Sequence, residues 1–227
     1  MNKTAIFIDG AYYRKRASHL WGKKPPDRRA AELYAYCMEH IKQVRRDEGE
    51  ESSRQLYRIF YYDCEPLSKV VYHPLIKKNI DFRKSDTYKW TLELFDCLRG
   101  QRKMCLRTGI LLDSNASFNI HPDKMKALLA GKIDLVDLTE KDFSPSWSQK
   151  GVDMKLGIDI CSVAYKHQVD QIILIAGDTD FVPAAKIARR EGLDVILDPM
   201  WSDHVTDKLS EHVDGIRSCW RKKDNSH

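Results

Sequence analysis

Aspartates recur at one kind of place in this sequence, directly after a short apolar run. Asp9 follows the run from Ala5 to Ile8, and Asp178 and Asp180 follow the run that ends at Ala176. The carboxyl ends of parallel strands meet at one edge of an open α/β sheet, and ligand sites form there. The spacing therefore predicts that these three carboxylates gather at one edge of a sheet.

Not every aspartate in such a place needs a chemical role. Asp63 and Asp113 also follow apolar segments, but Asp is common in turns and caps, and that is the better interpretation for both. Asp180 precedes Phe181-Val182-Pro183, where capping of a helix and catalysis are equally open and do not exclude each other.

Two further carboxylates belong to a helix that we expect from Val152 to Lys166. At about 100° per residue, its apolar positions fall within one arc of about 80° that should face the sheet. Asp153 and Asp159 flank this arc by about 20° on opposite sides. A carboxylate so close to a core is costly unless a cation or good donors meet it. A helix ion pair with Lys155 remains the alternative for Asp159, and local capping remains the alternative for Asp153. The apolar arc consists of Val152, Leu156, Ile160 and Val163.

Several carboxylates with no His or Cys among them match the ligand preference of a hard divalent cation, Mg²⁺ or Mn²⁺ rather than Zn²⁺. A bound ion would keep the carboxylates ionised, hold a phosphodiester oxygen and activate an attacking water. The sequence shows no Ser/His/Asp arrangement, no Gly-rich phosphate loop and no GxGxxG motif, so covalent hydrolases and dinucleotide-binding proteins lack their essential parts. The residues therefore indicate metal-assisted phosphoryl hydrolysis with water as the nucleophile.

The elements that must position these side chains alternate between strands and helices. Such alternation predicts a three-layer α/β domain, with a central mainly parallel sheet of four to five strands flanked by helices. The expected strands are Ala5–Ile8, Gln55–Tyr62, Met104–Leu112 ending at Asp113, Gln171–Ala176 and Leu193–Leu197. The expected helices are Lys15–Leu20, Arg28–Arg46, one around Trp90–Leu98, Asp123–Ala130, Val152–Lys166 and Asp180–Arg190, with loops at Asp47–Ser53 and Asp142–Ser148.

Length and composition bound the class of protein. A chain of 227 residues with 42% hydrophobic residues can bury a core as one domain, expected over residues 1–220, before a polar and frayed tail at 221–227. The sequence has no apolar stretch of membrane length and no leader pattern. Its six cysteines form no CxxC pair, which predicts reduced thiols and a cytoplasmic location. A net charge of +5 slightly favours a polyanionic partner.

Three motifs occur together in this sequence. They are Phe7-Ile8-Asp9-Gly10, Lys150-Gly151-Val152-Asp153 with Asp159 six residues on, and Ala176-Gly177-Asp178-Thr179-Asp180-Phe181-Val182-Pro183. Together they resemble a known family, the bacterial LabA-like NYN domain. Tyr57 to Asp63, Arg107-Thr108-Gly109 and Leu197-Asp198-Pro199-Met200-Trp201 extend the resemblance over nearly the whole chain. The resemblance implies a PIN-like fold and a metal-dependent endoribonuclease, with Asp9, Asp153, Asp178 and Asp180 as catalytic metal carboxylates, Asp159 in support and Lys150 facing a phosphate.

The implied substrate is RNA, in single strands or loops, and its phosphates and unpaired bases need partners. Basic residues near the expected site would follow the phosphates, and aromatic residues would stack on the bases, although a solvated surface and packing against the first helix are the ordinary alternatives. The candidate phosphate partners are Arg14, Lys15, Arg16, Lys150 and Lys155, and the candidate stacking residues are Tyr12, Tyr13 and Trp201.

Other functions stay open beside the nuclease. Tyr12 stands where many relatives have Asn, and Ala176 where many have Ser, so a catalytically inactive module that binds RNA or a protein is the main alternative. Asp178-Thr179-Asp180 also matches the DxD motif of metal-dependent glycosyltransferases, which leaves Asp9 and Asp153 unexplained. A dehalogenase-type phosphatase is excluded because it needs an Asp where this chain has Ala11. No membrane partner is expected, and a homodimer is one open assembly.

Overall fold

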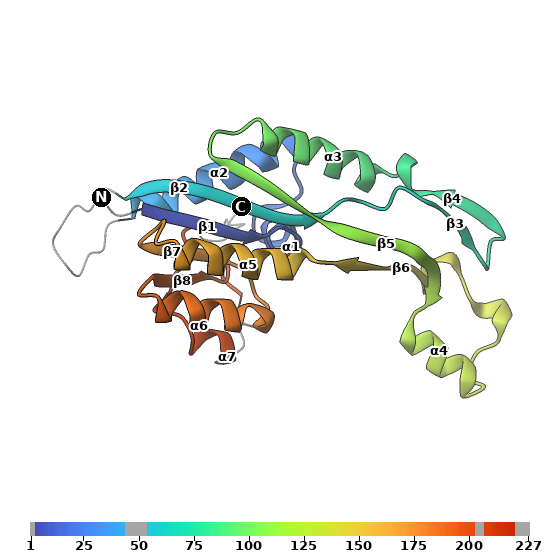
Figure 1. The fold of residues 1–227 in the computed structure, drawn as a ribbon. Coiled ribbons are helices and arrows are strands. Elements are labelled where there is room, and N and C mark those ends of the chain that lie inside the picture. Colours follow the sequence, from blue (N-terminus) through green and yellow to red (C-terminus); the bar gives the residue numbers. More distant parts are fainter. Residues whose placement is uncertain (1–2, 44–53, 203–206, 221–227) are drawn as a thin grey trace, which may run out of the picture. The chain divides into compact units, whose positions relative to one another are not determined.

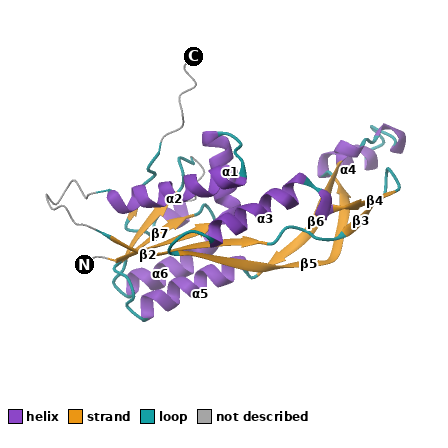
Figure 2. Cartoon of the chain, turned by 90° about the horizontal axis from the view of Figure 1, so that it is seen from above, coloured by secondary structure: helices purple, strands orange, loops and turns teal. Residues whose placement is uncertain are grey.

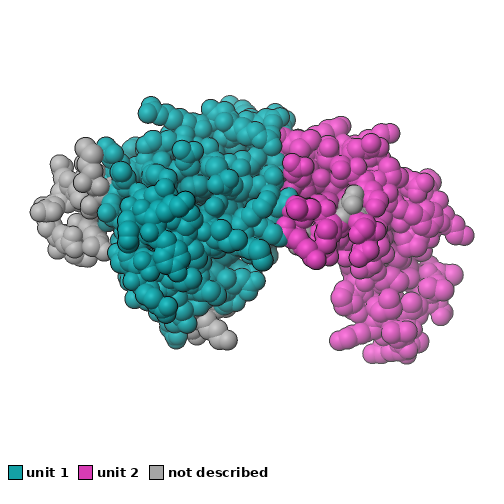
Figure 3. Space-filling model, viewed as in Figure 1, with its two compact units in different colours: residues 1–63, 93–109, 151–227 teal, residues 64–92, 110–150 magenta. Residues whose placement is uncertain are grey.

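The structure, a computed structural model, describes residues 3–43, 54–202 and 207–220. The expected loop Asp47–Ser53, the end of the helix expected to reach Arg46 and the tail 221–227 lie outside these residues. The chain divides into two compact units (Figure 3). Unit 1 consists of Met1–Asp63, Glu93–Gly109 and Gly151–His227, and unit 2 consists of Cys64–Leu92 and Ile110–Lys150. The division into a single domain over residues 1–220 stays a prediction.

Strands and helices alternate along most of the chain, as the apolar periodicity predicts. The strands are β1 (Lys3–Asp9), β2 (Gln55–Cys64), β3 (Val70–His73), β4 (Lys78–Asp81), β5 (Met104–Ile120), β6 (Phe143–Lys150), β7 (Gln171–Ile175), β8 (Asp194–Asp198) and β9 (Gly215–Ile216). The helices are α1 (Gly10–Trp21), α2 (Pro26–Lys42), α3 (Asp86–Arg99), α4 (Pro122–Leu129), α5 (Val152–Tyr165), α6 (Val182–Arg190) and α7 (Asp207–Ser210).

The central sheet is larger than the sequence indicates. It has seven strands in the order β6-β5-β2-β1-β7-β8-β9, and a separate two-stranded sheet pairs β3 with β4. The expectation of four to five strands is therefore wrong. The sheet is mainly parallel, as expected, because β1 pairs in parallel with β2 and β7, β7 with β8, and β8 with β9. The antiparallel pair is β5 with β6.

Helices cover both faces of the unit 1 sheet. In Figures 1 and 2, α1 and α2 lie on one face, and α5 and α6 lie on the other. Crossovers between parallel strands require this arrangement, since each connecting helix packs on a sheet face. The structure confirms the expected α/β architecture of a central sheet flanked by helices.

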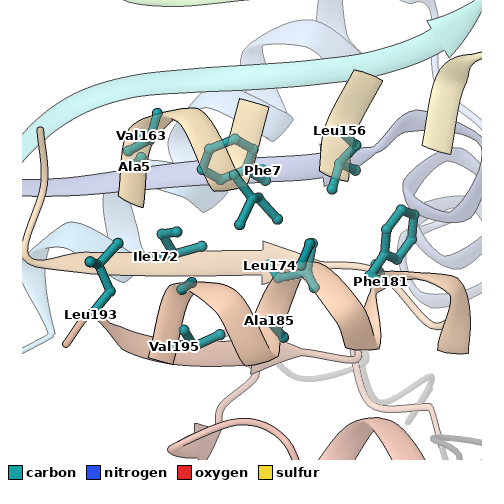
Figure 4. Close-up of a cluster of buried hydrophobic side chains, with 14 of the residues drawn as sticks. Ala5, Phe7, Leu156, Val163, Ile172, Leu174, Phe181, Ala185, Leu193 and Val195 are labelled. Atoms are coloured by element: carbon teal, nitrogen blue, oxygen red, sulfur yellow. The ribbon is translucent and has the colours of Figure 1, made fainter. Parts of the chain in front are cut away.

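The apolar residues of α5 face the sheet as the helical wheel predicts. Leu156, Ile160 and Val163 are buried, and Val152 packs against the same cluster. Figure 4 shows this cluster between β1, β7, α5 and α6. All five residues of β7 are buried, which is the continuous apolar pattern of a central parallel strand covered on both faces. This core fixes where β1 and β7 end, and so where the aspartates after them lie.

Several elements differ from the sequence-based expectation; α1, for example, begins at Gly10 rather than Lys15, and β3, β4 and β9 were not expected. β5 does not end at Asp113 but continues to Ile120, so Asp113 lies within a strand of unit 2 rather than at a strand end. The expected loop at Asp142–Ser148 is largely strand β6, paired with β5. The helix expected from Asp180 begins at Val182, after a short 3₁₀ turn over Thr179–Phe181.

Unit 2 has its own aromatic cluster. The Phe118 ring centroid lies 4.4 Å from that of His73 and 5.9 Å from that of Phe82, which in turn lies 5.7 Å from Trp147. Aromatic contacts at these distances stabilise a small core beyond the area that they bury.

Within the described ranges, the helices all fall short of the length and apolar character that crossing a membrane requires.

Candidate functional site

Asp9 is the last residue of β1 and the N-cap of α1. Its Oδ1 accepts a hydrogen bond from the backbone N–H of Tyr12 at 3.1 Å, so the turn from strand to helix fixes the carboxylate. Burial raises the pKa of Asp9 to about 6, and the negative charges of Asp153 and Asp63 add to this rise. Asp9 has no cationic side chain as an ion-pair partner in the described part of the chain. It is therefore a carboxylate whose ionised form needs an additional cation.

Asp153 connects Asp9 electrostatically with the segment after β7. The pKa of Asp153 is raised, first by burial and then by the charges of Asp178 and Asp180. Asp153 belongs to the first turn of α5, and Asp178 caps the 3₁₀ turn with its Oδ1 accepting the N–H of Asp180 at 3.1 Å. Side chains from three distant parts of the chain therefore repel one another in one neighbourhood, which is the arrangement that the strand-end argument predicts.

A cleft of about 450 Å³ opens beside Asp9 and Asp178. We call it the carboxylate cleft; Asp9, Ala11, Tyr12, Lys15, Gly177, Asp178 and Thr179 line it. Tyr12 forms one wall, because its ring lies against Gly177 and its hydroxyl donates to the Pro199 carbonyl at 2.7 Å. A Cβ atom at position 177 would lie 2.4 Å from that ring, so only glycine fits there. Gly10 is confined in the same way, with Tyr61 and the Tyr62 carbonyl 2.6 Å from an added Cβ.

Asp159 has different partners from the other four carboxylates. Its Oδ2 accepts the Tyr62 hydroxyl at 2.8 Å and the Arg107 Nε at 3.1 Å. The alternative ion pair with Lys155 is absent from the described residues, since the Lys155 Nζ donates to the Thr108 carbonyl at 2.7 Å. The structure therefore gives Asp159 a tyrosine and an arginine as donors, and a supporting role at a metal stays a prediction for it.

The basic residues proposed for phosphate contact differ in what they touch. Arg14 pairs with buried Asp63 at 3.0 Å, so this arginine neutralises a carboxylate. Asp63 lies within β2, so the expected turn or cap role is wrong, and its partner is a cation from α1 instead. Arg16 donates twice to the Met200 carbonyl, at 3.1 Å and 2.6 Å. Lys15 is exposed and lines the carboxylate cleft, which leaves it as the cation best placed to meet a phosphate there.

Two further predicted contact residues, Lys150 and Trp201, are not among those that line the carboxylate cleft. Lys150 ends β6 and belongs to unit 2, whereas the carboxylate cleft belongs to unit 1; its contact with a phosphate stays a prediction. Trp201 is 44% exposed, and its indole N–H donates to the Trp220 carbonyl. Its backbone has a left-handed φ of 55°, as does that of Met200 with 47°. Such conformations persist only where the surroundings hold them.

The group that holds this turn was missed by the sequence reasoning. Asp198 ends β8 and is completely buried, and its carboxylate accepts four hydrogen bonds. The donors are the Tyr36 hydroxyl at 2.5 Å, His40 Nε2 at 2.8 Å, the Met200 N–H at 2.7 Å and the Ser218 hydroxyl at 2.7 Å. The rule applied to Asp9, an aspartate at the carboxyl end of a parallel strand, would have found it. Asp198 fixes this turn. The carbonyls of Pro199 and Met200 in the turn accept hydrogen bonds from Tyr12 and Arg16, respectively.

The donor set fits a hard divalent cation in type, and its spacing limits how the ion could be held. Within the described ranges, no three His, Cys, Asp or Glu side chains are close enough to hold a metal ion together. Mg²⁺ usually keeps several waters and binds through one or two carboxylates plus the phosphates of its substrate. Asp9, half-buried and repelled by its neighbours, fits such a site, and Asp153 and Asp178 are the carboxylates available to join it.

Comparison with known proteins finds one family and distant relatives. A family model described as NYN domain matches residues 3–215. A protein of Methanocaldococcus jannaschii, called uncharacterized protein MJ0482, is 26% identical over 117 residues, which are 43% of this chain and 49% of that protein. The chain thus spans about half the length of this relative. A crystal structure of VPA0982 from Vibrio parahaemolyticus, of unknown function, covers 95% of this chain and 91% of its own at 13% identity and a TM-score of 0.43, too low for any argument.

Proposed function

The chain belongs to the NYN domain family, which is nuclease-like and has a PIN-like fold, and from this premise we propose that it is a metal-dependent endoribonuclease. The proposed substrate is single-stranded or loop RNA, and the proposed cofactor is Mg²⁺ or Mn²⁺. The LabA-like subtype, a bacterial origin, a cytoplasmic location and a homodimer belong to the same proposal. The family itself indicates RNA as the binding partner.

The observation that carries the proposal is the state of Asp9. Its carboxylate is half-buried, lies among like charges and receives backbone donors but no ion pair from the described residues. Such a group costs stability when it is ionised, unless a cation binds beside it. A structural aspartate in the same fold is paired instead, as Asp63 is with Arg14.

Each side chain of the carboxylate cleft then has a defined task. Asp9 and one of its acidic neighbours, Asp153 or Asp178, would hold the cation together with the phosphate of the substrate, and the remaining carboxylates would keep the local potential negative. A bound Mg²⁺ or Mn²⁺ supplies an activated water and stabilises charge on the phosphodiester oxygens. Lys15 would meet a phosphate at the rim of the cleft. Tyr12, fixed through Pro199, would form the wall against which the substrate lies.

The test is cleavage of a labelled single-stranded RNA with Mn²⁺ by the parent chain and by Asp9→Asn and Asp178→Asn. We expect both variants to cut at least about a hundredfold more slowly, because each loses a ligand charge at the reacting phosphate. Asp123→Asn, an exposed aspartate in the first turn of α4, is the matched control and should cut at the parent rate. Far-ultraviolet circular dichroism must show that all variants fold. Parent-like cleavage by folded Asp9→Asn would refute this mechanism.

One observation favours a second function, that of an RNA- or protein-binding module without catalysis. The described carboxylates do not form a three-ligand group, and Tyr12 takes the place of an amide side chain beside them. The same assay separates the two functions. A parent chain that binds RNA and leaves it intact with Mg²⁺, Mn²⁺ and a range of substrates is a binding module.

A further inference from the structure

A second pocket of unit 1 is lined by side chains that the nuclease chemistry does not use. It has a volume of about 220 Å³, and we call it the arginine pocket. The residues that matter for its chemistry are Tyr57, Arg58, Phe60, Arg107 and Asp159. Two guanidinium groups and one carboxylate give it a net positive charge. This is the opposite sign from the carboxylate cleft.

A β-bulge creates one wall of the arginine pocket. On β1, Thr4 pairs with Leu56 and the next residue, Ala5, pairs with Arg58, so Tyr57 is an extra residue in β2. Successive side chains of a regular strand point to opposite faces, but a bulge can turn neighbours to the same side. Tyr57 and Arg58 accordingly both line the pocket. The Tyr57 hydroxyl donates to the Gln168 Oε1 at 3.2 Å, which fixes the bulge.

Arg58 and Arg107 have different surroundings, and each keeps guanidinium donors that are not used by contacts within the fold. The Arg107 guanidinium lies 6.0 Å from the centre of the Phe60 ring and pairs with Asp159, while the side chain remains 45% exposed. An ion pair so exposed contributes little to stability. Arg58 is exposed and has no side-chain hydrogen bond or ion pair to the residues that the structure describes. Both guanidinium groups thus keep donors for a ligand, and their flat forks match the oxygens of a phosphate.

The arginine pocket is linked to the proposed metal carboxylates through β2 and α5. Tyr62 pairs in register with Asp9, and its hydroxyl reaches Asp159, the carboxylate bound to Arg107. Lys155 lies two residues after Asp153 on α5 and contacts the carbonyl of Thr108, the neighbour of Arg107. Lys155, Arg107 and Arg58 are therefore cations of unit 1 on elements that also carry, or pair with, the proposed metal carboxylates.

We propose that the arginine pocket binds a phosphate group of a nucleotide, through the guanidinium groups of Arg58 and Arg107. Resting on the proposed ribonuclease function, the occupant is a phosphodiester of the same RNA strand that reaches the carboxylate cleft, so that the pocket sets the path of this strand. A free nucleotide carries the same phosphate chemistry, and the experiment distinguishes the two sources. Asp159 competes with the phosphate for Arg107 and keeps this arginine oriented in the empty pocket.

The experiment measures binding in the absence of metal, so that it does not depend on cleavage. Fluorescence anisotropy with a labelled single-stranded oligouridylate in EDTA gives the affinity of the full chain over a range of salt concentrations. Arg58→Gln and Arg107→Gln should each weaken binding roughly three- to tenfold and reduce the slope of log affinity against log salt by about 0.7, the value for one phosphate contact to a single strand. Arg190→Gln, an exposed arginine at the end of α6, is the matched control and should leave both quantities unchanged.

A fourth variant should change the affinity for RNA in the opposite direction. Asp159→Asn removes the competing negative charge, so it should strengthen binding about twofold or more, whereas loss of a merely structural ion pair would weaken or not affect it. Calorimetry with ADP provides the second arm. If ADP binding is lost in the two arginine variants while RNA binding is unchanged, the phosphate belongs to a free nucleotide and the assignment of the pocket stands.

The proposal is overturned if Arg58→Gln and Arg107→Gln bind both RNA and ADP like the parent. Equal weakening by Arg190→Gln also overturns it, because the charge effect would then be general. The proposal is also overturned if the parent chain binds neither RNA nor ADP. The cleavage assay with Asp9→Asn is read separately, so a failed arginine pocket leaves the proposed nuclease standing, and a chain that cuts no RNA leaves the phosphate pocket measurable.

Discussion

Two aspartates at the carboxyl ends of parallel strands have opposite surroundings. Asp198 at the end of β8 is completely buried and accepts hydrogen bonds from a tyrosine, a histidine, a serine and a backbone amide. Asp9 at the end of β1 receives backbone donors and lies near the like charges of Asp153 and Asp63. The topology brings both residues to strand ends, so position alone does not distinguish a structural aspartate from a functional one.

The difference lies in which groups neutralise each carboxylate. The chain supplies every donor that Asp198 needs, and this region forms a closed network. The region around Asp9 gathers negative charge, and the residues that the structure describes provide Asp9 with no ion-pair partner. We therefore regard the donor inventory, rather than burial or sequence position, as the property that marks a candidate catalytic carboxylate in this fold.

The largest expected effect tests the hydrogen-bond network around Asp198. Asp198→Ala leaves the buried Tyr36 hydroxyl, His40 and the Ser218 hydroxyl without their acceptor, and we expect the free energy of unfolding to fall by about 3–5 kcal/mol. Chemical denaturation monitored by circular dichroism measures this loss. Asp194→Asn, at the other end of β8, provides a milder control. A loss below about 1 kcal/mol for Asp198→Ala would show that the network is not closed, and the contrast with Asp9 would disappear.

The next-largest expected effect tests the region around Asp9 through the pH dependence of the protein's stability. The pKa of Asp9 is about 6 in the folded chain and about 3.9 in an unfolded one, so the native state binds more protons between these values. Stability from this group is therefore greatest below about pH 4 and falls as the pH rises to about 6, by about 3 kcal/mol in total. Unfolding midpoints of metal-free parent and Asp9→Asn across this range measure it, since the variant should lack this part of the decline.

A cation should reverse this loss in the parent chain only. At pH 7, Mn²⁺ at a hundred times its dissociation constant should stabilise the parent by about 2.7 kcal/mol and Asp9→Asn by much less. Equal stabilisation of both proteins would place the ion away from Asp9. A pH profile of Asp9→Asn that matches the parent would show that Asp9 titrates normally, and the distinction between the two regions would then rest on geometry alone.

The smallest effect tests the residue that joins the two regions. Tyr12 lines the carboxylate cleft and donates to Pro199, which follows Asp198. Tyr12→Phe removes one hydrogen bond and should cost about 1 kcal/mol of stability. If the bond also positions the wall of the cleft, the KM for RNA should rise in addition to this small loss of stability. An unchanged KM would separate the Asp198 network from the site.

The sequence predicts best where burial is continuous. The βαβ pattern of the last third, with α5, β7, α6 and β8, lies within a few residues of the expected boundaries because each element buries one unbroken apolar face. The same logic placed Asp9 and Asp178 at strand ends. Such elements carry their periodicity in the local sequence, and this is the information that a single chain provides.

Unit 2 shows where this information ends. The β6 sequence Phe143-Ser-Pro-Ser-Trp-Ser-Gln-Lys alternates apolar residues with serines only over its first five positions, and its proline and serines are typical of a loop, so that its pairing with β5 is what makes it a strand. A strand specified by pairing rather than by a continuous apolar face leaves a weak signal in the sequence. For the same reason the extension of β5 beyond Asp113 could not be anticipated.

Side-chain partners from other elements are equally invisible to a helical wheel. The wheel offers Asp159 a neighbour one turn away, Lys155, whereas the structure supplies Arg107 and Tyr62 from strands. Arg14 was expected to follow a phosphate and instead neutralises Asp63, 49 residues away. Arg58 enters its pocket through a bulge, and only the register of β1 with β2 reveals that bulge. These contacts depend on tertiary pairing.

Two glycines beside the carboxylates have a consequence for how such chains are recognised. An added methyl group at Gly10 or Gly177 would collide with a neighbouring tyrosine, whatever ion the cleft holds. A protein of this architecture that had lost its catalytic power would still need both residues to fold. In the dipeptides Asp9-Gly10 and Gly177-Asp178 the glycine therefore reports only the close packing of the turn, whereas the aspartate both caps the element that follows and carries the charge of the site.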